Sequence, residues 1–428
     1  MTPQSGFVDA GGTRGRFAWA LYDWAGQAFH TLIVTFVFAA YFSQGIVGDD
    51  VRGQELWGAA SSISGLFVAL LAPIIGAVAD AGGPRKPWLL AFSAIAAAAS
   101  ALLWWAGPDT AFILWAMVWF AVAGVAFEFC QVFANAMLPD IAPASRVGRW
   151  SGWGWGMGYA GGLVSITLAL VLFVQTDTPL FGLDKSAAEH VRIVGPMTAA
   201  WLVAFAIPMF LWTPDRAAKV AGLGAQARSG LADLVRTLRA VRRYGDIVRF
   251  LVARMLYADG LTTVFVFGGI YAAGAFGMEL AEVLLFGIVL NLTAGVGAIA
   301  FGWIDDHMGP KRTILLSLAG LFVTATGALV VTSVTGFWVF GSALGIFVGP
   351  AQAASRSLMS RLAPAAQRTE FFGLYALTGK ATAFLGPALV AMLTAATDSQ
   401  RWGLSVLLLF FAGGAALLFT VREPAAGG

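Results

Sequence analysis

The sequence is poor in charge, cysteine and histidine, and each shortage excludes a class of protein. Only 11% of the 428 residues are charged and 59% are hydrophobic, so the chain is not a soluble protein. Cys130 is its single cysteine, which rules out an internal disulfide and is expected to act as a small buried hydrophobe. Its three histidines lie in different regions, and no metal-ligand cluster or Ser or Cys nucleophile motif occurs. We therefore expect no enzyme, no cofactor and no metal site.

Long apolar stretches are abundant, and twelve of them are long enough to cross a bilayer as α-helices. No cleavable signal is expected, because Met1 to Gly15 is polar and glycine-rich and the first apolar stretch is too long for a signal peptide. The predicted fold class is an all-α membrane protein with twelve transmembrane helices. The predicted spans are 17–42, 57–79, 87–106, 111–138, 151–174, 194–213, 248–276, 281–304, 313–333, 335–360, 370–396 and 402–421.

The basic residues gather on one side of these spans. Of the 26 Lys and Arg, Arg254 and Lys380 fall inside spans and most of the others fall on the side of the N-terminus. The exceptions on the opposite side are Arg52, Lys185, Arg192 and Arg401. This asymmetry predicts that both termini are cytoplasmic. The net charge of +3 then reflects membrane topology, and we expect no nucleic-acid partner.

One short phrase occurs twice, after the second and the eighth predicted span. Both copies have Gly four residues before Asp, Gly three residues after it, then Pro and two basic residues. The first copy is Gly76, Asp80, Gly83, Pro84, Arg85 and Lys86, and the second is Gly302, Asp306, Gly309, Pro310, Lys311 and Arg312. The match between the two halves extends beyond this phrase, because Gly152 of the first half corresponds to Gly373 of the second. Two parallel copies of one half are typical of a transporter that rocks around a central site.

The longest polar stretch separates the two copies and divides the chain. Within it, Leu231, Leu234 and Val235 recur at helical spacing while Arg236 and Arg239 fall on other faces, which predicts a basic amphipathic helix. A tether between the halves and a regulatory or partner-binding helix both remain open. The predicted organisation is an N-terminal tail (1–16), a first half (17–213), a linker (214–247), a second half (248–421) and a C-terminal tail (422–428).

The repeat, together with two further strings, resembles a known family. The strings are Trp19-Ala20-Leu21-Tyr22-Asp23-Trp24-Ala25 and Tyr257-Ala258-Asp259-Gly260-Leu261. The chain is similar to the major facilitator superfamily over essentially its whole length, and within it to the vacuole-effluxer-like, autophagy-related branch. This resemblance implies two pseudo-symmetric six-helix halves, a cavity lined by spans one, four, seven and ten, and amino acid efflux. The chain departs from the family at Gly26-Gln27, where Asn-Ser is usual, and at Pro84, where Arg is common.

Ionisable side chains within the spans mark the candidate cavity. Each costs roughly 2.5–3.5 kcal/mol at the bilayer centre, so each needs a partner or a function. Polar stripes on spans one and four must face something other than lipid. Glu128 is the expected proton carrier, because burial favours its neutral form; pairing of Lys380 with Glu128 or Asp259 is an open structural alternative. The residues expected to bind the small-molecule substrate or protons are Tyr22, Asp23, Gln27, His30, Glu128, Gln131, Asn135, Tyr257, Asp259, Asn291 and Lys380.

The doubled phrase predicts a gate at the cytoplasmic ends of spans two and eight. There a carboxylate reaches basic groups or the positive N-terminus of a neighbouring helix. A purely topological role would explain the basic residues but not the fixed Gly-Asp-Gly register. The expected gate residues are Gly76, Asp80, Gly83, Arg85, Lys86, Gly302, Asp306, Gly309, Lys311 and Arg312.

These features together predict a secondary active transporter that moves a small polar solute by alternating access with proton coupling. Amino acids moved outward are the expected solute, on the strength of the resemblance. A facilitator or exporter of another metabolite or drug, and a non-transporting receptor or scaffold, remain alternatives. The Ala- and Gly-rich composition without an organelle address favours a bacterial inner membrane. No obligate protein partner is expected beyond the lipid bilayer.

Overall fold

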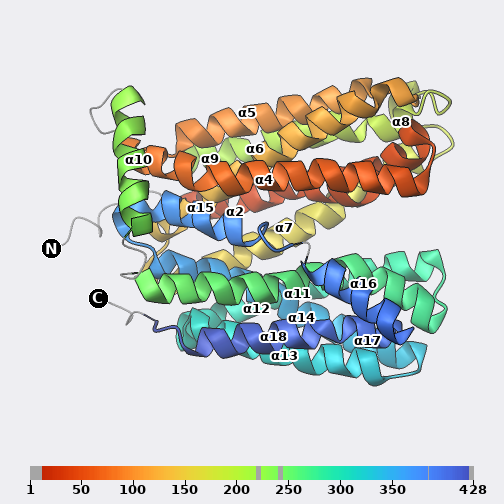
Figure 1. Cartoon of the computed structure of the whole chain (residues 1–428). Helices are drawn as coiled ribbons and strands as arrows, with labels where there is room; N and C mark the ends of the chain where they lie inside the picture. The colour runs from red at the N-terminus through yellow and green to blue at the C-terminus, as the bar shows by residue number, and fades with distance from the viewer. Residues whose placement is uncertain (1–11, 218–222, 240–243, 384, 424–428) are drawn as a thin grey trace.

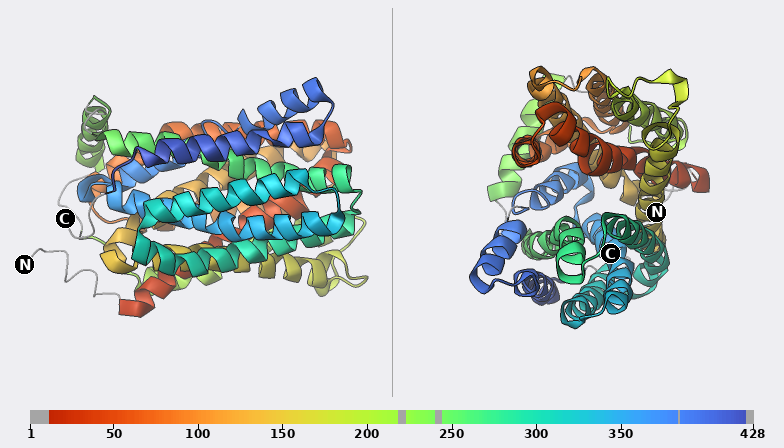
Figure 2. Two further views of the ribbon diagram at one scale, coloured as in Figure 1. Left: turned by 90° about the horizontal axis from the view of Figure 1, so that it is seen from below. Right: turned by 90° about the vertical axis from the view of Figure 1, so that its right-hand side faces the viewer.

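The computed structural model describes residues 12–217, 223–239, 244–383 and 385–423, and within these ranges the secondary structure is entirely helical. Long helices run side by side along one axis in two groups (Figures 1 and 2). The first group consists of α2 (Gly12–Ala28) with η1 (Phe29–Phe36), α3 (Val37–Tyr41) and η2 (Phe42–Val47), then α4 (Asp50–Gly82), α5 (Lys86–Leu102), α6 (Ile113–Ile141), α7 (Val147–Ala169) with η6 (Leu170–Val174), α8 (Glu189–Arg192) and α9 (Val194–Trp212).

The second group follows the linker helix α10 (Leu223–Arg239). It consists of α11 (Gly245–Phe276), α12 (Leu280–Met308), α13 (Pro310–Val330), α14 (Val334–Leu362), α15 (Arg368–Thr378), α16 (Leu385–Thr397), α17 (Gln400–Leu404) and α18 (Val406–Phe419). Residues 1–11, 218–222, 240–243 and 424–428, which include parts of both predicted tails and of the predicted linker, lie outside the described residues.

The number of continuous spans is a correction to the sequence prediction. Among the described residues, eleven helices are long and apolar enough to cross a membrane, not twelve. The predicted span 370–396 is instead two shorter helices, α15 and α16 (Figure 1). Residues 379–383 between them are non-helical, and we call these residues the break. The other predicted spans correspond to helices that the structure contains, with ends that differ by several residues.

The break after α15 has a local cause. In a continuous helix the Tyr375 carbonyl would accept from the Gly379 amide, but Gly379 N donates to Ala376 O instead, at 3.1 Å. Arg254 Nη1 on α11 donates a hydrogen bond to the Tyr375 carbonyl oxygen at 2.8 Å and one to the Thr378 hydroxyl oxygen at 2.7 Å. A side chain of a neighbouring helix therefore satisfies the end of α15, which permits non-helical backbone inside a membrane bundle.

The two halves meet along two matching helix pairs, α4 with α15 and α7 with α12. Glycines of the repeat allow the close approach. A Cβ at Gly76 would lie 2.5 Å from the Thr369 carbonyl oxygen, and one at Gly152 would lie 2.3 Å from that of Ala298. Small residues at such positions let membrane helices pack backbone to backbone.

The helix α10 lies across one end of the bundle (Figure 1). It packs against α4, where Leu234 is buried and a Cβ at Gly230 would lie 2.7 Å from the Ala77 carbonyl oxygen. Helix α4 ends here at Gly82, and α12 ends here at Met308. We call this end of the bundle the α10 end and the opposite end the distal end. The start of α2 and the end of α18 also lie at the α10 end (Figure 2).

Candidate functional site

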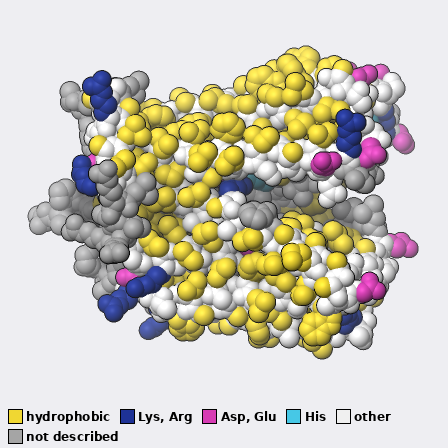
Figure 3. All heavy atoms as spheres, viewed as in Figure 1, with side chains coloured by type: hydrophobic (Ala, Val, Ile, Leu, Met, Phe, Trp, Pro, Cys, Tyr) yellow, Lys and Arg dark blue, Asp and Glu magenta, His cyan; other side chains and the backbone are white. Residues whose placement is uncertain are grey.

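A cavity of about 590 Å³ lies between the two halves. Its walls include side chains of α2, η1, α6 and α7 from the first half and of α11, α12, α14 and α15 from the second. The space-filling view shows a hollow between the halves with basic and histidine side chains inside it (Figure 3). The predicted residues that line the cavity are Asp23, Gln27, His30, Glu128, Gln131, Asn135, Asn291 and Lys380.

Three predicted cavity residues are not part of this lining, which corrects the sequence prediction. Tyr22 turns away from the cavity and shares a hydrogen bond of 2.6 Å with Ser93. Tyr257 does the same with Ser355, also at 2.6 Å. Asp259 is buried at the level where α16 packs on the α11 backbone, and it does not line the cavity. Helical spacing places residues on a common face, but packing decides which neighbour that face meets.

Glu128 and Lys380 form an ion pair across the cavity. Lys380 Nζ lies 2.6 Å from Glu128 Oε1, and both side chains are partly exposed, at 37% and 22%. Of the two partners left open for Lys380, the structure therefore selects Glu128. Because Lys380 lies in the break between α15 and α16, the pair ties that break to α6 of the other half.

A second ion pair, between Arg356 and Asp23, closes the cavity towards the α10 end. Arg356 Nη1 donates to Asp23 Oδ2 at 2.7 Å and to Asn135 Oδ1 at 3.0 Å. Its Nε donates to Ser151 Oγ at 2.9 Å, and Nη2 donates to Ser151 O at 2.6 Å. The guanidinium is 2% exposed and lies over the Trp19 ring at 4.8 Å.

Sequence reasoning missed Arg356 as a site residue. It falls near the end of the predicted span 335–360, so its position groups it with the basic residues at helix ends. A signal was present, because Asp23 is an acid near the end of another span and needs a partner there. Arg254, predicted only as a basic residue inside a span, also lines the cavity together with Gln352, Tyr159 and Tyr375.

Arg254 gives the cavity an excess of positive charge. Its guanidinium carbon lies 3.5 Å from the centre of the Tyr375 ring, and it has no ion-pair partner among the described residues. Asp23 and Glu128 each form an ion pair with one base, whereas the hydrogen bonds of Arg254 go to the Tyr375 carbonyl and the Thr378 hydroxyl. The lining therefore offers acceptors for a cationic group and, for an anionic group, one cation that has no ion-pair partner among the described residues.

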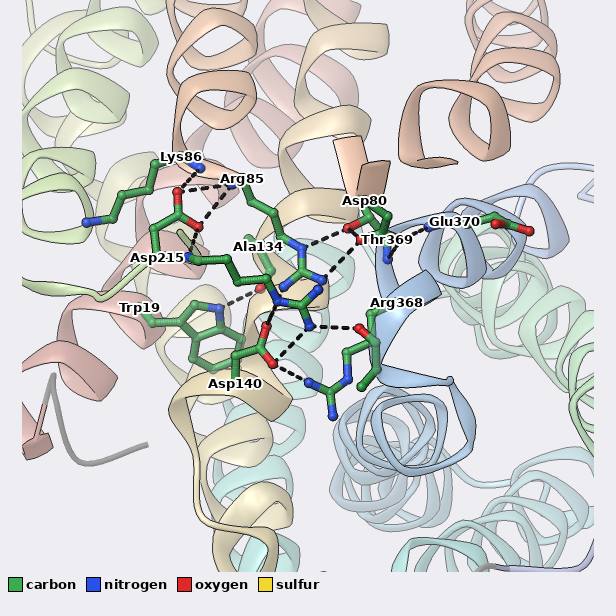
Figure 4. A network of polar contacts seen from close by, with 12 residues as sticks. Trp19, Asp80, Arg85, Lys86, Ala134, Asp140, Asp215, Arg368, Thr369 and Glu370 are labelled. Carbon is green, nitrogen blue, oxygen red and sulfur yellow. Dashed lines mark hydrogen bonds and ion pairs between the residues drawn. The ribbon is translucent and has the colours of Figure 1, made fainter. Parts of the chain in front are cut away.

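The aspartates of the doubled phrase connect the halves at the α10 end. Asp80 on α4 accepts from Thr369 N at 2.7 Å and Glu370 N at 3.0 Å, at the start of α15 (Figure 4). Asp306 on α12 accepts from Arg149 N at 3.1 Å, at the start of α7. Each carboxylate thus occupies the positive N-terminus of a helix from the opposite half.

Basic residues surround the Asp80 contact. Arg85 Nη1 lies 2.6 Å from Asp140 Oδ2, and its Nε donates to Thr369 Oγ1 across the halves at 2.8 Å. Arg216 and Arg368 pair with the same Asp140, so one carboxylate joins three guanidinium groups (Figure 4).

The remaining residues of the phrase stay within their own half. Lys86 donates to Phe210 O at 3.0 Å, and Lys311 donates to Val421 O at 2.7 Å, while Arg312 is exposed. The prediction that these three lysine and arginine side chains join the gate is therefore corrected. Gly83 and Gly309 have φ angles of 101° and 86°, which explains why glycine occurs at both turns.

Comparisons with known proteins agree with this architecture. Residues 46–149 and 143–426 match the family model described as "Vacuole effluxer Atg22 like". The MFS-type transporter YxiO of Bacillus subtilis (strain 168), described as uncharacterized, is 26% identical over 416 residues, which cover 96% of this chain and 95% of that protein. Autophagy-related protein 22 of Coccidioides immitis (strain RS) is 25% identical over 410 residues, covering 78% of this chain and 66% of that protein.

Solved structures share the fold at low identity. FucP, a major facilitator superfamily transporter in the outward conformation, superposes with a TM-score of 0.76 at 12% identity, covering 97% of this chain and 100% of that one. The human organic anion transporter MFSD10 gives 0.71 at 15% identity, covering 98% and 100%. The resemblance drawn from the sequence is confirmed: the chain belongs to the Atg22-like vacuole effluxer family of the major facilitator superfamily and is a multi-pass membrane transporter, not an enzyme.

Proposed function

We propose that this protein is a secondary transporter that carries a small polar solute through the central cavity by alternating access. One observation carries the proposal: a polar cavity of about 590 Å³ lies between two halves that the repeat relates, and contacts between those halves close it at the α10 end. Such a cavity is the expected site of a transporter whose halves rock around a fixed substrate.

The excess of basic residues at the α10 end supports a cytoplasmic position for that end and for both termini, in a bacterial inner membrane. The structure then represents an outward-facing state, with the gate of Asp80 and Asp306 closed. Charge-assisted hydrogen bonds of this kind contribute about 1.5–3 kcal/mol each. An inward-facing state loses them, so they bias the equilibrium towards the outward-facing state.

The charges in the cavity favour a zwitterionic solute, and we propose amino acids moved outward as that solute. Arg254 offers a carboxylate a guanidinium that has no ion-pair partner among the described residues, and the Glu128–Lys380 pair offers a carboxylate to an ammonium group. The aromatic ring of Tyr375 and the side chain of Phe372 add an apolar wall beside these charges. Mixed recognition of this type fits a solute with both signs of charge.

Proton coupling is proposed to act through Glu128. The Lys380 ammonium at 2.6 Å stabilises the carboxylate form, so protonation of Glu128 breaks the pair and frees Lys380. Because the pair connects the two halves, its loss also weakens their contact on the cavity wall. Proton binding, solute binding and the rocking of the halves then all depend on the Glu128–Lys380 pair.

The test uses proteoliposomes loaded with a broad metabolite mixture, with and without a pH gradient, and mass spectrometry of what crosses. We expect selective flux of amino acids that the pH gradient drives and that Glu128→Gln makes independent of pH. Asp177→Asn, at an exposed loop position, serves as the matched control. Selective flux of another compound would contradict the amino acid proposal, and absence of flux from every preparation would contradict transport by this chain alone.

A further inference from the structure

Asp259 is a buried carboxylate without a countercharge in the middle of α11. Its side chain is 2% exposed, and its Oδ2 atom is fully buried without a hydrogen bond among the described residues. No basic side chain of the described residues forms an ion pair with it. A lone ionised carboxylate at membrane depth is costly unless something neutralises it.

The other acids of the bundle interior show what Asp259 lacks. Asp23 pairs with Arg356 and Glu128 pairs with Lys380, at 2.7 and 2.6 Å. Asp80 accepts backbone amides at the start of α15. The structure thus provides each of these carboxylates with a positive partner, whereas Asp259 faces none.

The carboxylate of Asp259 lies against the break between α15 and α16. The Thr382 hydroxyl, within that break, interacts with the carboxylate, although no hydrogen bond of normal geometry reaches its buried Oγ1 atom among the described residues. The start of α16 packs tightly on α11 at this level, because a Cβ at Gly386 would lie 3.2 Å from Asp259 O. A carboxylate oxygen and a hydroxyl oxygen with unused capacity therefore face each other across two elements.

The groups packed around this place do not supply a cation. On α11 itself, Arg254 is held by Tyr375 O and the Thr378 hydroxyl. Lys380, from the break, is held by Glu128. From the opposite side α18 contributes the apolar Phe410 and Phe411, which contact Gly260.

We propose that Asp259 and Thr382 form a binding site for one small monovalent cation, Na⁺ or a proton. A single negative charge in an apolar environment is neutralised by a single positive charge, and oxygen ligands suit a hard cation. No group of three or more His, Cys, Asp or Glu that could hold a metal occurs in the described part of the chain, which argues against a transition metal. Unwound helix segments in transporters commonly coordinate such ions.

Cation binding at Asp259 is then coupled to solute binding in the cavity, a step that rests on the proposed transport function. Thr382 lies two residues after Lys380 in the same break. A cation that draws Thr382 towards Asp259 moves the backbone that carries Lys380, and so changes its contact with Glu128. Cation binding at Asp259 and solute binding in the cavity are then linked through one short segment.

The experiment measures cation binding to the purified full-length protein, without any solute or transport. Thermal unfolding is recorded at pH 8 with increasing Na⁺, and with choline at matched ionic strength. A cation that binds the folded state alone raises the midpoint in a saturable way. We expect a rise with Na⁺ that is absent in Asp259→Asn, shifted to roughly tenfold higher Na⁺ in Thr382→Val, and unchanged in Asp177→Asn.

A second series without Na⁺ distinguishes the proton. If the proton is the cation, Na⁺ has no effect, and lowering the pH from 8 towards 5 raises the midpoint of the unaltered protein more than that of Asp259→Asn. Removal of a buried charge leaves Asp259→Asn at least as stable as the cation-free protein at pH 8, so a folded variant is expected. The proposal is overturned if Asp259→Asn keeps the Na⁺ response, or if neither cation affects the unaltered protein differently from Asp259→Asn.

Discussion

Arg356 of the second half lies 2.7 Å from Asp23 of the first, and this buried pair joins the halves between the cavity and the α10 end. Removal of one partner from such a pair leaves an uncompensated charge and costs about 3–5 kcal/mol. We expect Arg356→Gln to lower the free energy of unfolding by that amount. The double variant Asp23→Asn with Arg356→Gln should recover a large part of it. A double-mutant cycle on thermal unfolding measures the coupling, and additive effects of the two changes would contradict it.

The gate gives a prediction on conformation. Asp80→Asn removes the charge that occupies the N-terminus of α15 while it keeps the shape of the side chain. We expect the population to shift towards the state open at the α10 end by about 1–2 kcal/mol, a five- to thirtyfold change. In a Cys130→Ala background, a cysteine introduced at Ala376 reports this as faster labelling from that side. Asp177→Asn provides the control, and equal labelling rates in both variants would exclude the gate.

The pair of Glu128 and Lys380 predicts a specific pattern of pH dependence. Glu128→Gln removes the group that takes up the proton, so transport should continue without responding to pH. Lys380→Met leaves Glu128 without its cation, so the transition should move to higher pH, because the neutral acid is then favoured. Flux measured from pH 5 to 9 tests both variants. A Glu128→Gln profile equal to that of the unaltered protein would assign coupling elsewhere.

The glycines between the halves predict a steric effect on stability. A Cβ at Gly152 would lie 2.3 Å from Ala298 O on α12, so Gly152→Ala forces α7 and α12 apart and should cost about 1–3 kcal/mol. Gly58 on α4 has no atom within 4 Å of a Cβ, so Gly58→Ala should be neutral or slightly stabilising. Thermal unfolding of the two single variants compares them directly. Equal midpoints for the two variants would contradict close packing at Gly152.

The repeat could be recognised from the sequence because the same residue types occur at the same spacing in both halves, whatever their packing. Asp80 and Asp306 stand in the same register, and the structure shows that both contact the opposite half. Which helix each aspartate meets could not be predicted, since that depends on how α4 lies against α15 and α12 against α7. Local sequence determines the helices, whereas packing between halves determines their partners.

Two other features depend on contacts that no single helix encodes. The stretch 370–396 is apolar enough to predict one span. In the structure, however, Arg254 of α11 donates a hydrogen bond to the Tyr375 carbonyl oxygen at the end of α15. Arg356 lies where a helix-end arginine is unremarkable, and only its contact with Asp23 reveals its position in the bundle interior. The orientation of Tyr22 and Asp259 around their helices likewise follows from packing.

The most direct test of alternating access is a pair of distance measurements at the two ends of the bundle. In a Cys130→Ala background, spin labels at Ser145 and Ala366 report the α10 end, and labels at Ala111 and Thr335 report the distal end; these four positions are exposed. Double electron–electron resonance is recorded with and without the Asp80→Asn and Asp306→Asn changes. We predict that the distance at the α10 end lengthens while that at the distal end shortens. Two distances that stay fixed, or that change in the same direction, would contradict a transporter that rocks around its central cavity.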